Sequence, residues 1–225
     1  MTRRVSSSTA LPYFPVGNDI VDRADPEAAK KHLNGRFVSR VLTKREKRLF
    51  DESADPGLML WSFWAAKETA YKIFSRIDRD ISAWPRLYET YFQNTPGVNQ
   101  PVTGRVVSGG MAATILLTPA ADYVHCLGTA GTADDLTTIM YGLYRLPGPA
   151  RGFRKLSRRV RNSLRESVAE ETNVHIDRVH IVREKGPRGL LPPILVIDGK
   201  PAAACISISH DGSFAAFART PLPHI

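Results

Sequence analysis

The sequence predicts an α+β fold made of two similar halves related by a pseudo-twofold axis. Three observations predict it. Helix-like and strand-like segments alternate over 225 residues, which suffice for one domain or two small ones. Residues 113–129 align without a gap to residues 204–220, and each copy has the pattern of a hairpin. A stretch rich in Pro and Gly, 144–152, has the composition of a linker. We therefore expect domains at 1–133 and 150–225.

The first half has a clear expected order. It runs as a strand (14–22), helical segments interrupted near Asn34-Gly35 (26–50), a helix (58–76), a turn-rich loop (94–104) and three strands in "RVV", "AATILLT" and "YVHCLGTA". Thr43 followed by Glu46 has the spacing of a capping box, which would begin a short helix.

The second half is expected to contain a long basic helix (153–171), strands in "VHIVRE" and "ILVI", and two final strands. Its last two strands form the second copy of the repeat. Identical residues occur at Ala113/Ala204, Ile115/Ile206 and Thr129/Thr220. Only the second copy has Ser-His-Asp (209–211) at its turn, where the first has Thr-Pro-Ala (118–120). Duplication followed by division of labour would give this difference.

Composition limits the compartment and the partners. We find no apolar run of membrane-helix length and no signal-peptide core, so we expect a cytoplasmic protein with a short N-terminal lead-in. Cys126 and Cys205 are then expected to be reduced and buried. The formal net charge of +9 favours an acidic partner: nucleic acid, an anionic membrane, a phosphorylated ligand or an acidic protein.

Two carboxylates stand in apolar surroundings. Trp64, Glu68 and Lys72 are spaced four apart and share one stripe of the predicted helix. A Glu68–Lys72 ion pair would explain the stripe, and a turn cap would explain Asp19 at the end of the first strand. Together, however, Asp19 and Glu68 are what Mg²⁺ needs when it arrives with a phosphate ligand, and Lys72 lies one turn away from Glu68.

The basic helix offers a second phosphate site. "RGFRKLSRRVRNSLR" contains seven Lys and Arg and no acidic residue. It is either a solvated or nucleic-acid-binding face, or the site of a multiply charged phosphate ligand. The turns "DGKPAA" and "SISHDG" would bring Lys200 and His210 to such a ligand. The chain has no Walker A loop and no GxGxxG.

Together these motifs resemble the 4'-phosphopantetheinyl transferase superfamily. "VGNDIVD" is similar to its first motif, G-x-D-[IV], and "FWAAKETAYK" to its second, W-x-x-K-E-[AST]-x-x-K. "DGKP" and "SISHDG" look like its G-K-P and S-H-[SDT] coenzyme A turns, and "RFVSRVLTKREKRLF" resembles the segment between the metal motifs. The motif order is that of the trimeric holo-acyl-carrier-protein-synthase type. The length is that of the two-lobed type, so we expect a two-lobed monomer with its lobes swapped in sequence.

The resemblance implies transfer of 4'-phosphopantetheine from coenzyme A to a serine of an acyl or peptidyl carrier protein, with release of adenosine 3',5'-bisphosphate. It implies Asp19 and Glu68 as Mg²⁺ ligands, Lys72 as a catalytic cation and Glu46 as a general base, unless Glu46 only completes the capping box. The residues it implies for coenzyme A are Lys200, Ser209, His210, Arg154, Lys155 and Arg158. Acidic carrier proteins would suit the basic surface, with Arg36, Arg40, Lys44 and Arg45 as weaker contact candidates.

The sequence departs from the family pattern at two positions of the first motif. Many two-lobed members have a third metal ligand where this chain has Val21; we expect water there rather than Asp22, which would face away from Asp19 on a regular strand. Asn18 replaces an apolar residue, and the sequence offers no reason for it. Two other functions remain open: a basic nucleic-acid-binding protein, for which stacking aromatics are few, and an inactive relative that only binds carrier proteins.

Overall fold

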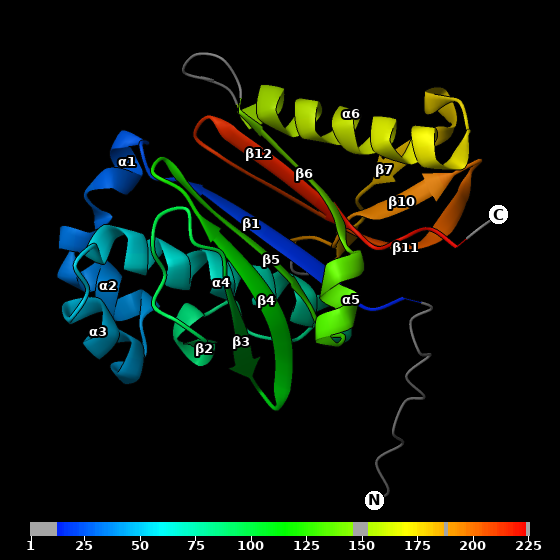
Figure 1. Cartoon of the computed structure of the whole chain (residues 1–225). Helices are drawn as coiled ribbons and strands as arrows, with labels where there is room; N and C mark the ends of the chain where they lie inside the picture. Colours follow the sequence, from blue (N-terminus) through cyan, green and yellow to red (C-terminus); the bar gives the residue numbers. More distant parts are fainter. Residues whose placement is uncertain (1–12, 146–152, 187–188, 224–225) are drawn as a thin grey trace, which may run out of the picture.

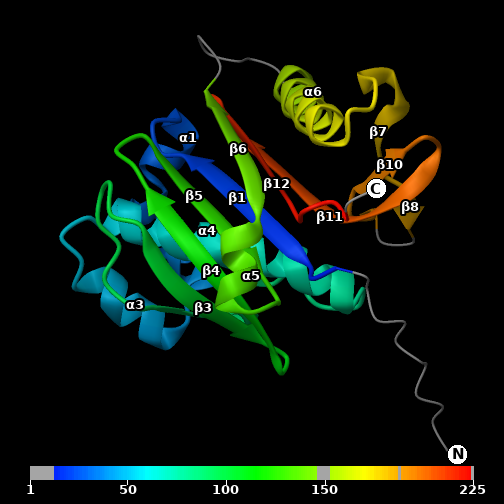
Figure 2. The same cartoon turned by 45° about the vertical axis from the view of Figure 1, so that its right-hand side comes forward.

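The computed structural model describes residues 13–145, 153–186 and 189–223. Two five-stranded antiparallel sheets lie side by side, each with one long helix on a face (Figures 1 and 2). The arrangement confirms the predicted α+β fold with two similar halves. None of the helices in the described ranges has the length and apolar character that a membrane crossing requires.

The first sheet has the strand order β1-β5-β4-β3-β2. Its strands are β1 (Val16–Asp22), β2 (Glu89–Phe92), β3 (Val102–Ser108), β4 (Met111–Pro119) and β5 (Tyr123–Thr129). The long helix α4 (Pro56–Ile77) packs on one face, where its Ala66, Ala70 and Ile73 meet Ile115 and Cys126 of the sheet. This contact forms the core of the first half and fixes the rotation of α4 about its axis.

Short helices connect β1 to α4. They are α1 (Pro26–Ala29), the 3₁₀ turn η1 (Lys31–Leu33), α2 (Gly35–Val41) and α3 (Lys44–Asp51), and the turn η2 (Pro85–Leu87) follows α4. The interruption predicted near Asn34-Gly35 is present, because Asn34 caps α2 by accepting a hydrogen bond from Phe37 N. The capping box of Thr43 and Glu46 is also present at the start of α3.

The second sheet has the order β6-β12-β11-β10-β7, which repeats the order of the first sheet strand for strand. Its elements are β6 (Met140–Arg145), α6 (Phe153–Thr172), the turn η3 (Ile176–Arg178), β7 (Val179–Val182), β10 (Ile194–Ile197), β11 (Lys200–Asp211) and β12 (Phe214–Arg219). A small hairpin, β8 (Lys185–Gly186) with β9 (Gly189–Leu190), is inserted between β7 and β10. Helix α6 covers one face through Val160, Leu164 and Val168.

The predicted repeat has the same strand register in both copies. Ile115 pairs with Gly128 in the β4–β5 hairpin, and the aligned Ile206 pairs with Arg219 in β11–β12. Both sheets also place a separate strand beside the second strand of the hairpin, β1 in one and β6 in the other. The weak sequence match therefore marks a true structural repeat.

The sheet pairing moves one predicted boundary. Strand β6 belongs to the second sheet, so the second half begins at Met140 rather than at residue 150. The predicted linker 144–152 starts within β6, and residues 146–152 lie outside the described ranges. The short helix α5 (Ala133–Thr138) connects the halves. The sequence analysis missed β6 because the strand is short and has Gly142 near its centre, a residue that is uncommon inside strands. The glycine is required there, since an added Cβ would lie 2.6 Å from the Phe217 ring.

The halves meet where β1 lies against β11 and β12 (Figure 1). Two small apolar clusters hold this contact: one contains Val16, Leu127 and Cys205, and the other contains Ile20 and Phe214. Strand β1 is therefore sandwiched, with α4 on one side and the second half on the other. Alternate residues of one short strand face the two environments.

Candidate active site

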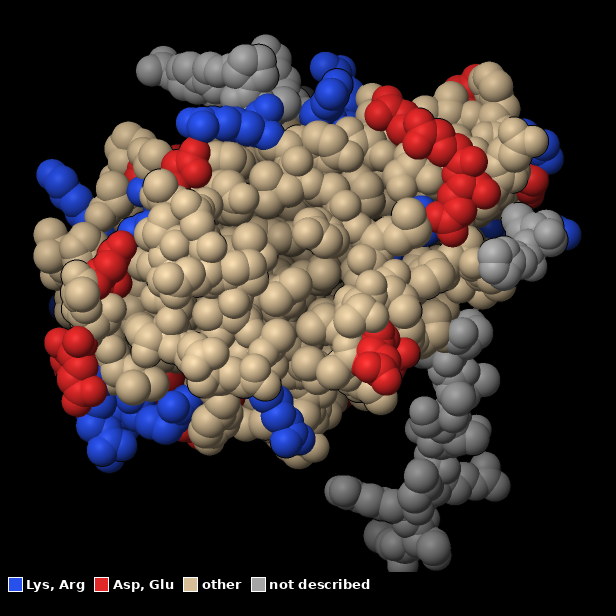
Figure 3. Space-filling model, in the orientation of Figure 1, with Lys and Arg blue, Asp and Glu red and all other residues tan. Residues whose placement is uncertain are grey.

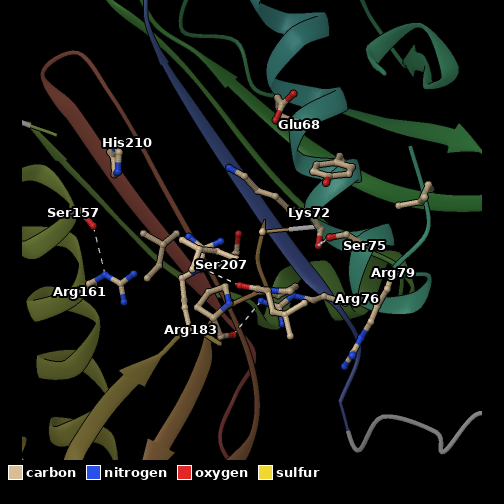
Figure 4. Close-up of a pocket in the computed structure, with 18 of the residues that line it drawn as sticks. Glu68, Lys72, Ser75, Arg76, Arg79, Ser157, Arg161, Arg183, Ser207 and His210 are labelled. Atoms are coloured by element: carbon tan, nitrogen blue, oxygen red, sulfur yellow. Dashed lines mark hydrogen bonds between the residues drawn. The ribbon is translucent and has the colours of Figure 1, made fainter. Parts of the chain in front are cut away.

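A pocket of about 740 Å³ lies between the halves (Figure 4). The first half contributes Glu68, Tyr71, Lys72, Ser75, Arg76, Arg79, Asp80 and Ile81 to its wall. The second half contributes Ser157, Arg161, Arg183, residues 189–193, Ser207, Ile208 and His210. A ligand in this pocket would touch both halves at once, as expected for a site at a domain interface.

Helix α4 supplies one wall as a stripe. Glu68, Lys72 and Arg76 follow one another at intervals of four residues and all line the pocket, and Asp80 joins the lining from the turn after the helix. The stripe extends the spacing that begins with Trp64 in the sequence. Arg76 is a site residue that the sequence analysis missed, although the same period would have found it.

Asp19 meets this stripe from β1. Its side chain shares one face of the β1–β5 pair with the opposite residue Cys126, and that face packs on α4. Lys72 Nζ lies 2.8 Å from Asp19 Oδ1 and donates a second hydrogen bond of 2.8 Å to the carbonyl oxygen of Asn18. Burial raises the pKa of Asp19, and the neighbouring Lys72 offsets part of that effect. The lysine thus pairs with Asp19, and not with Glu68 as an i,i+4 ion pair would require.

The carboxylate of Glu68 lies in surroundings that disfavour its ionised form. Burial, together with the charge of Asp19, raises its pKa to about 7. The Glu68 carboxylate makes no hydrogen bond to another residue in the described parts of the chain. Its side chain lines the pocket (Figure 4). A divalent cation between Glu68 and Asp19 would offset both causes of this raised pKa, the burial and the smaller repulsion by Asp19.

The donor set fits Mg²⁺. Among the described residues, no group of three or more His, Cys, Asp or Glu side chains is placed to hold a metal. Two carboxylates are nevertheless what Mg²⁺ commonly takes from a protein, because waters and substrate phosphates supply its other ligands. Asp22 adds none: its carboxylate accepts hydrogen bonds from Ala24 N and Ser213 N at the turn between β11 and β12. This agrees with the expectation that Asp22 faces away from Asp19.

Glu46 lies in a buried polar network and does not line the pocket. It is fully buried, and its two carboxylate oxygens accept hydrogen bonds from Thr43 N, Thr90 N and Lys67 Nζ at 2.8, 2.9 and 2.6 Å. Lys67 also donates to the carbonyl oxygens of Val41 and Pro85. Of the two readings left open by the sequence, this geometry supports the capping box, and Lys67 of the K-E motif is its buried counterion.

In the second half, one predicted residue lines the pocket and three do not. His210 lines it, and burial lowers its pKa. Ser209 is buried where β11 meets β1, and its Oγ accepts a hydrogen bond from Asn18 Nδ2 at 2.9 Å. Lys200 is exposed at the opposite end of β11 from His210, roughly 30 Å away along an extended strand. Arg158 is exposed on α6 and lines an adjoining surface pocket, which shares Ser157 and Arg161 with the first. The side chains of Arg154 and Lys155 lie outside the described residues.

Four arginines form the cationic wall instead, and one of them is Arg79. Arg76, Arg161 and Arg183 all line the pocket and come from α4, α6 and the segment after β7. Burial lowers the pKa of Arg183, and the nearby positive charges of Arg161 and Arg76 lower it further. Guanidinium groups gathered in this way favour a polyanionic ligand such as a phosphate.

The comparison with protein families agrees with the motifs of the first half. Residues 15–106 match the family described as "4'-phosphopantetheinyl transferase superfamily", which confirms the predicted resemblance over that range. No curated protein sequence gives a significant match. Among solved structures, the chain is similar to the Thermotoga maritima holo-[acyl-carrier-protein] synthase, with 16% identity, a TM-score of 0.38, and coverage of 84% of this chain and 86% of that one.

Proposed function

We propose that the protein transfers 4'-phosphopantetheine from coenzyme A to a serine hydroxyl of a carrier protein. One observation carries the proposal: one pocket between the halves is lined by Glu68 and Lys72 and by an arginine cluster, and Asp19, which does not itself line the pocket, pairs with Lys72 beside Glu68. Coenzyme A has a pyrophosphate and a separate 3'-phosphate, so its charges suit both places. The family match covers the half that holds the carboxylates.

In the proposed reaction, the serine Oγ forms a bond to the phosphorus that carries the pantetheine arm. The bond from that phosphorus to the bridging oxygen breaks, adenosine 3',5'-bisphosphate leaves with the electron pair, and the hydroxyl proton passes to solvent water. Such transfers depend mainly on positioning and on neutralising charge. Lys72 would stand beside the pyrophosphate and neutralise charge on its oxygens, and Arg161 and Arg183 would hold the nucleotide end.

Mg²⁺ held by Asp19 and Glu68 would polarise the phosphoryl oxygens and stabilise the leaving group. Burial raises the pKa of both carboxylates, and the charge of Asp19 raises that of Glu68 further, so their ionised forms are disfavoured when no cation is present. Lys72 keeps Asp19 oriented through its hydrogen bond to Oδ1. We therefore propose a cation-dependent reaction.

An acidic carrier protein would dock beside α2. Phe37 of α2 packs on Trp64, one turn before Glu68, with ring centroids 5.7 Å apart, so this helix borders the carboxylate end of the pocket. Arg40 lies over the exposed ring of Trp84 and Arg45 over that of Tyr91, which holds both cations in place at the surface. In Figure 3, Lys and Arg side chains gather over the same corner, near α3, whereas the face over β3–β5 has few charges.

Intact mass spectrometry of an apo carrier protein, incubated with this protein, coenzyme A and Mg²⁺, tests the proposal. We expect one phosphopantetheine mass to be added, and we expect no addition with EDTA or with Glu68→Ala. Arg178→Ala, at a surface ion pair with Asp198 far from the pocket, is the matched control and should retain the addition. If coenzyme A does not bind and no carrier of the fatty-acid, polyketide or peptide-synthetase class is modified, the proposal is wrong.

A further inference from the structure

The free edge of β1 is closed by side chains and not by another strand. Alternate residues of β11 point at it: Val16 N donates to Cys205 Sγ at 3.3 Å, Asn18 N to Ser207 Oγ at 3.0 Å, and Asp22 N to Asp211 Oδ2 at 2.8 Å. This set of contacts, which we call the seam, explains the alternating polar residues of "CISISHD". These three N–H groups of the β1 edge gain a partner without a continuous sheet.

Asn18 is the residue at which the seam meets the catalytic side of the pocket. Its carbonyl oxygen accepts a hydrogen bond from Lys72 Nζ at 2.8 Å, its N–H donates to Ser207 Oγ, and its Nδ2 donates to Ser209 Oγ at 2.9 Å. Ser207 itself lines the pocket. One residue therefore contacts the lysine of the first half and two serines of the second half.

The side chain of Asn18 is placed there at a cost. It is fully buried, and its Oδ1 has no hydrogen-bond partner in the described structure. An apolar residue would avoid this unpaired oxygen, so packing alone does not account for the amide. The cost is understandable if the Asn18–Ser209 hydrogen bond fixes how the halves are placed.

We propose that Asn18 is a positioning residue, which acts through Ser209 to fix β11 against β1 and so sets the spacing between Lys72 and the second-half wall of the pocket. Its effect on coenzyme A rests on the function proposed above. The proposal also gives Ser209 a role different from the one its motif implies: it holds Asn18 and does not contact the ligand.

The test is a double-mutant cycle with two readouts. Asn18→Leu, Ser209→Ala and the double variant are compared by calorimetric titration with coenzyme A and by hydrogen exchange of β1 and of α4 around Lys72. We expect each single variant to weaken binding about tenfold and to speed exchange in both segments, and the double variant to be no weaker than either single one. Cys205→Ala, which removes a seam acceptor away from Lys72, should speed exchange near Val16 only and leave affinity unchanged.

Each other outcome decides against the proposal. If Ser209→Ala weakens binding while Asn18→Leu does not, or if the two losses multiply, Ser209 contacts the ligand directly and the positioning role is wrong. If the unmodified protein does not bind coenzyme A, the proposed function fails. The seam is then judged by exchange alone: unchanged exchange around Lys72 in Asn18→Leu and Ser209→Ala overturns the positioning role as well.

Discussion

At the residue scale, the ionisation of Glu68 makes the free energy of unfolding depend on pH. Its pKa is raised to about 7 in the folded protein, mainly by burial. Between the ordinary value of 4.5 and about 7, the folded chain holds a proton that the unfolded chain has lost. The free energy of unfolding therefore falls as pH rises through this window, in the absence of a bound cation.

Glu68→Gln should remove this fall in the free energy of unfolding with rising pH, because glutamine does not ionise. Without divalent cations, we expect the variant to be more stable than the unmodified protein at pH 8 by roughly 1–3 kcal/mol, and nearly equal to it at pH 5. Urea unfolding at the two pH values measures the difference. Added Mg²⁺ should stabilise only the unmodified protein. An equal gain at both pH values would show that packing, and not ionisation, is responsible.

Glu46 gives a second prediction at this scale, because its buried pair with Lys67 leaves no part of it in the pocket. Gln has a single acceptor oxygen, so Glu46→Gln breaks the ion pair and leaves Lys67 buried without its counterion. We expect about 3–5 kcal/mol of destabilisation, seen as a lower midpoint in urea, with kcat of the folded enzyme retained. A large fall in kcat for protein shown to be folded would instead support the general-base role.

The residues of the site and of the motifs divide according to whether their placement is local. Glu68, Lys72 and Arg76 lie on one stripe because helix geometry alone puts them there. Arg183 and Ser209 depend on how the halves meet, which no local pattern encodes. Ser209 matched its motif but lies on the face of β11 that meets β1, whereas Arg183 matched no motif yet lines the pocket.

At the element scale, the contact of β1 with α4 depends on a glycine. A Cβ at Gly17 would lie 2.4 Å from the carbonyl oxygen of Thr69 and 2.9 Å from Ile73 Cγ1, so any side chain there pushes the helix away. The same helix presents Glu68 and Lys72 to Asp19 on the adjoining strand. Gly17 of the motif therefore lets α4 lie close enough to β1 for Glu68 to stand beside Asp19.

Gly17→Ala should lower both stability and activity. We expect a loss of roughly 1–3 kcal/mol in the free energy of unfolding, because the added methyl group meets backbone that cannot move cheaply. In the protein that remains folded, kcat should fall as Lys72 moves from Asn18. The matched control is Gly35→Ala at the start of α2, where an added Cβ meets nothing within 4 Å. Equal stability of the two variants would contradict this account of the β1–α4 contact.

Most elements of the first half and the second hairpin could be predicted because each has its own period or turn signal, but β2 (Glu89–Phe92) was missed. The predicted helix 58–76 differs from α4 by only two residues at its start and one at its end. Strand β6 could not be predicted: "MYGLYR" has no alternation, and only its pairing with β12 makes it a strand. The shared strand order of the sheets likewise became visible only in the fold.

At the scale of the whole molecule, the net charge of +9 is unevenly placed. Arginines line the pocket between the halves, and a second basic group stands beside α2 and α3, where Arg40 and Arg45 rest on aromatic rings. The two groups would serve different ligands, a small polyanion and an acidic protein surface. Salt screens the exposed group more than the enclosed one.

Substitution at the exposed group should therefore separate the two ligands. We expect Arg40→Glu to lower kcat/KM for an acidic carrier protein about tenfold, through slower association, while the KM for coenzyme A stays unchanged. Raising the ionic strength should lower kcat/KM of the unmodified protein and bring it closer to that of Arg40→Glu, because salt screens the attraction between Arg40 and the carrier protein. Arg178→Glu changes the net charge equally, but on the second half beside Asp198, and should have a much smaller effect. Equal losses in the two variants would mean that net charge, and not a docking surface beside α2, steers the carrier protein.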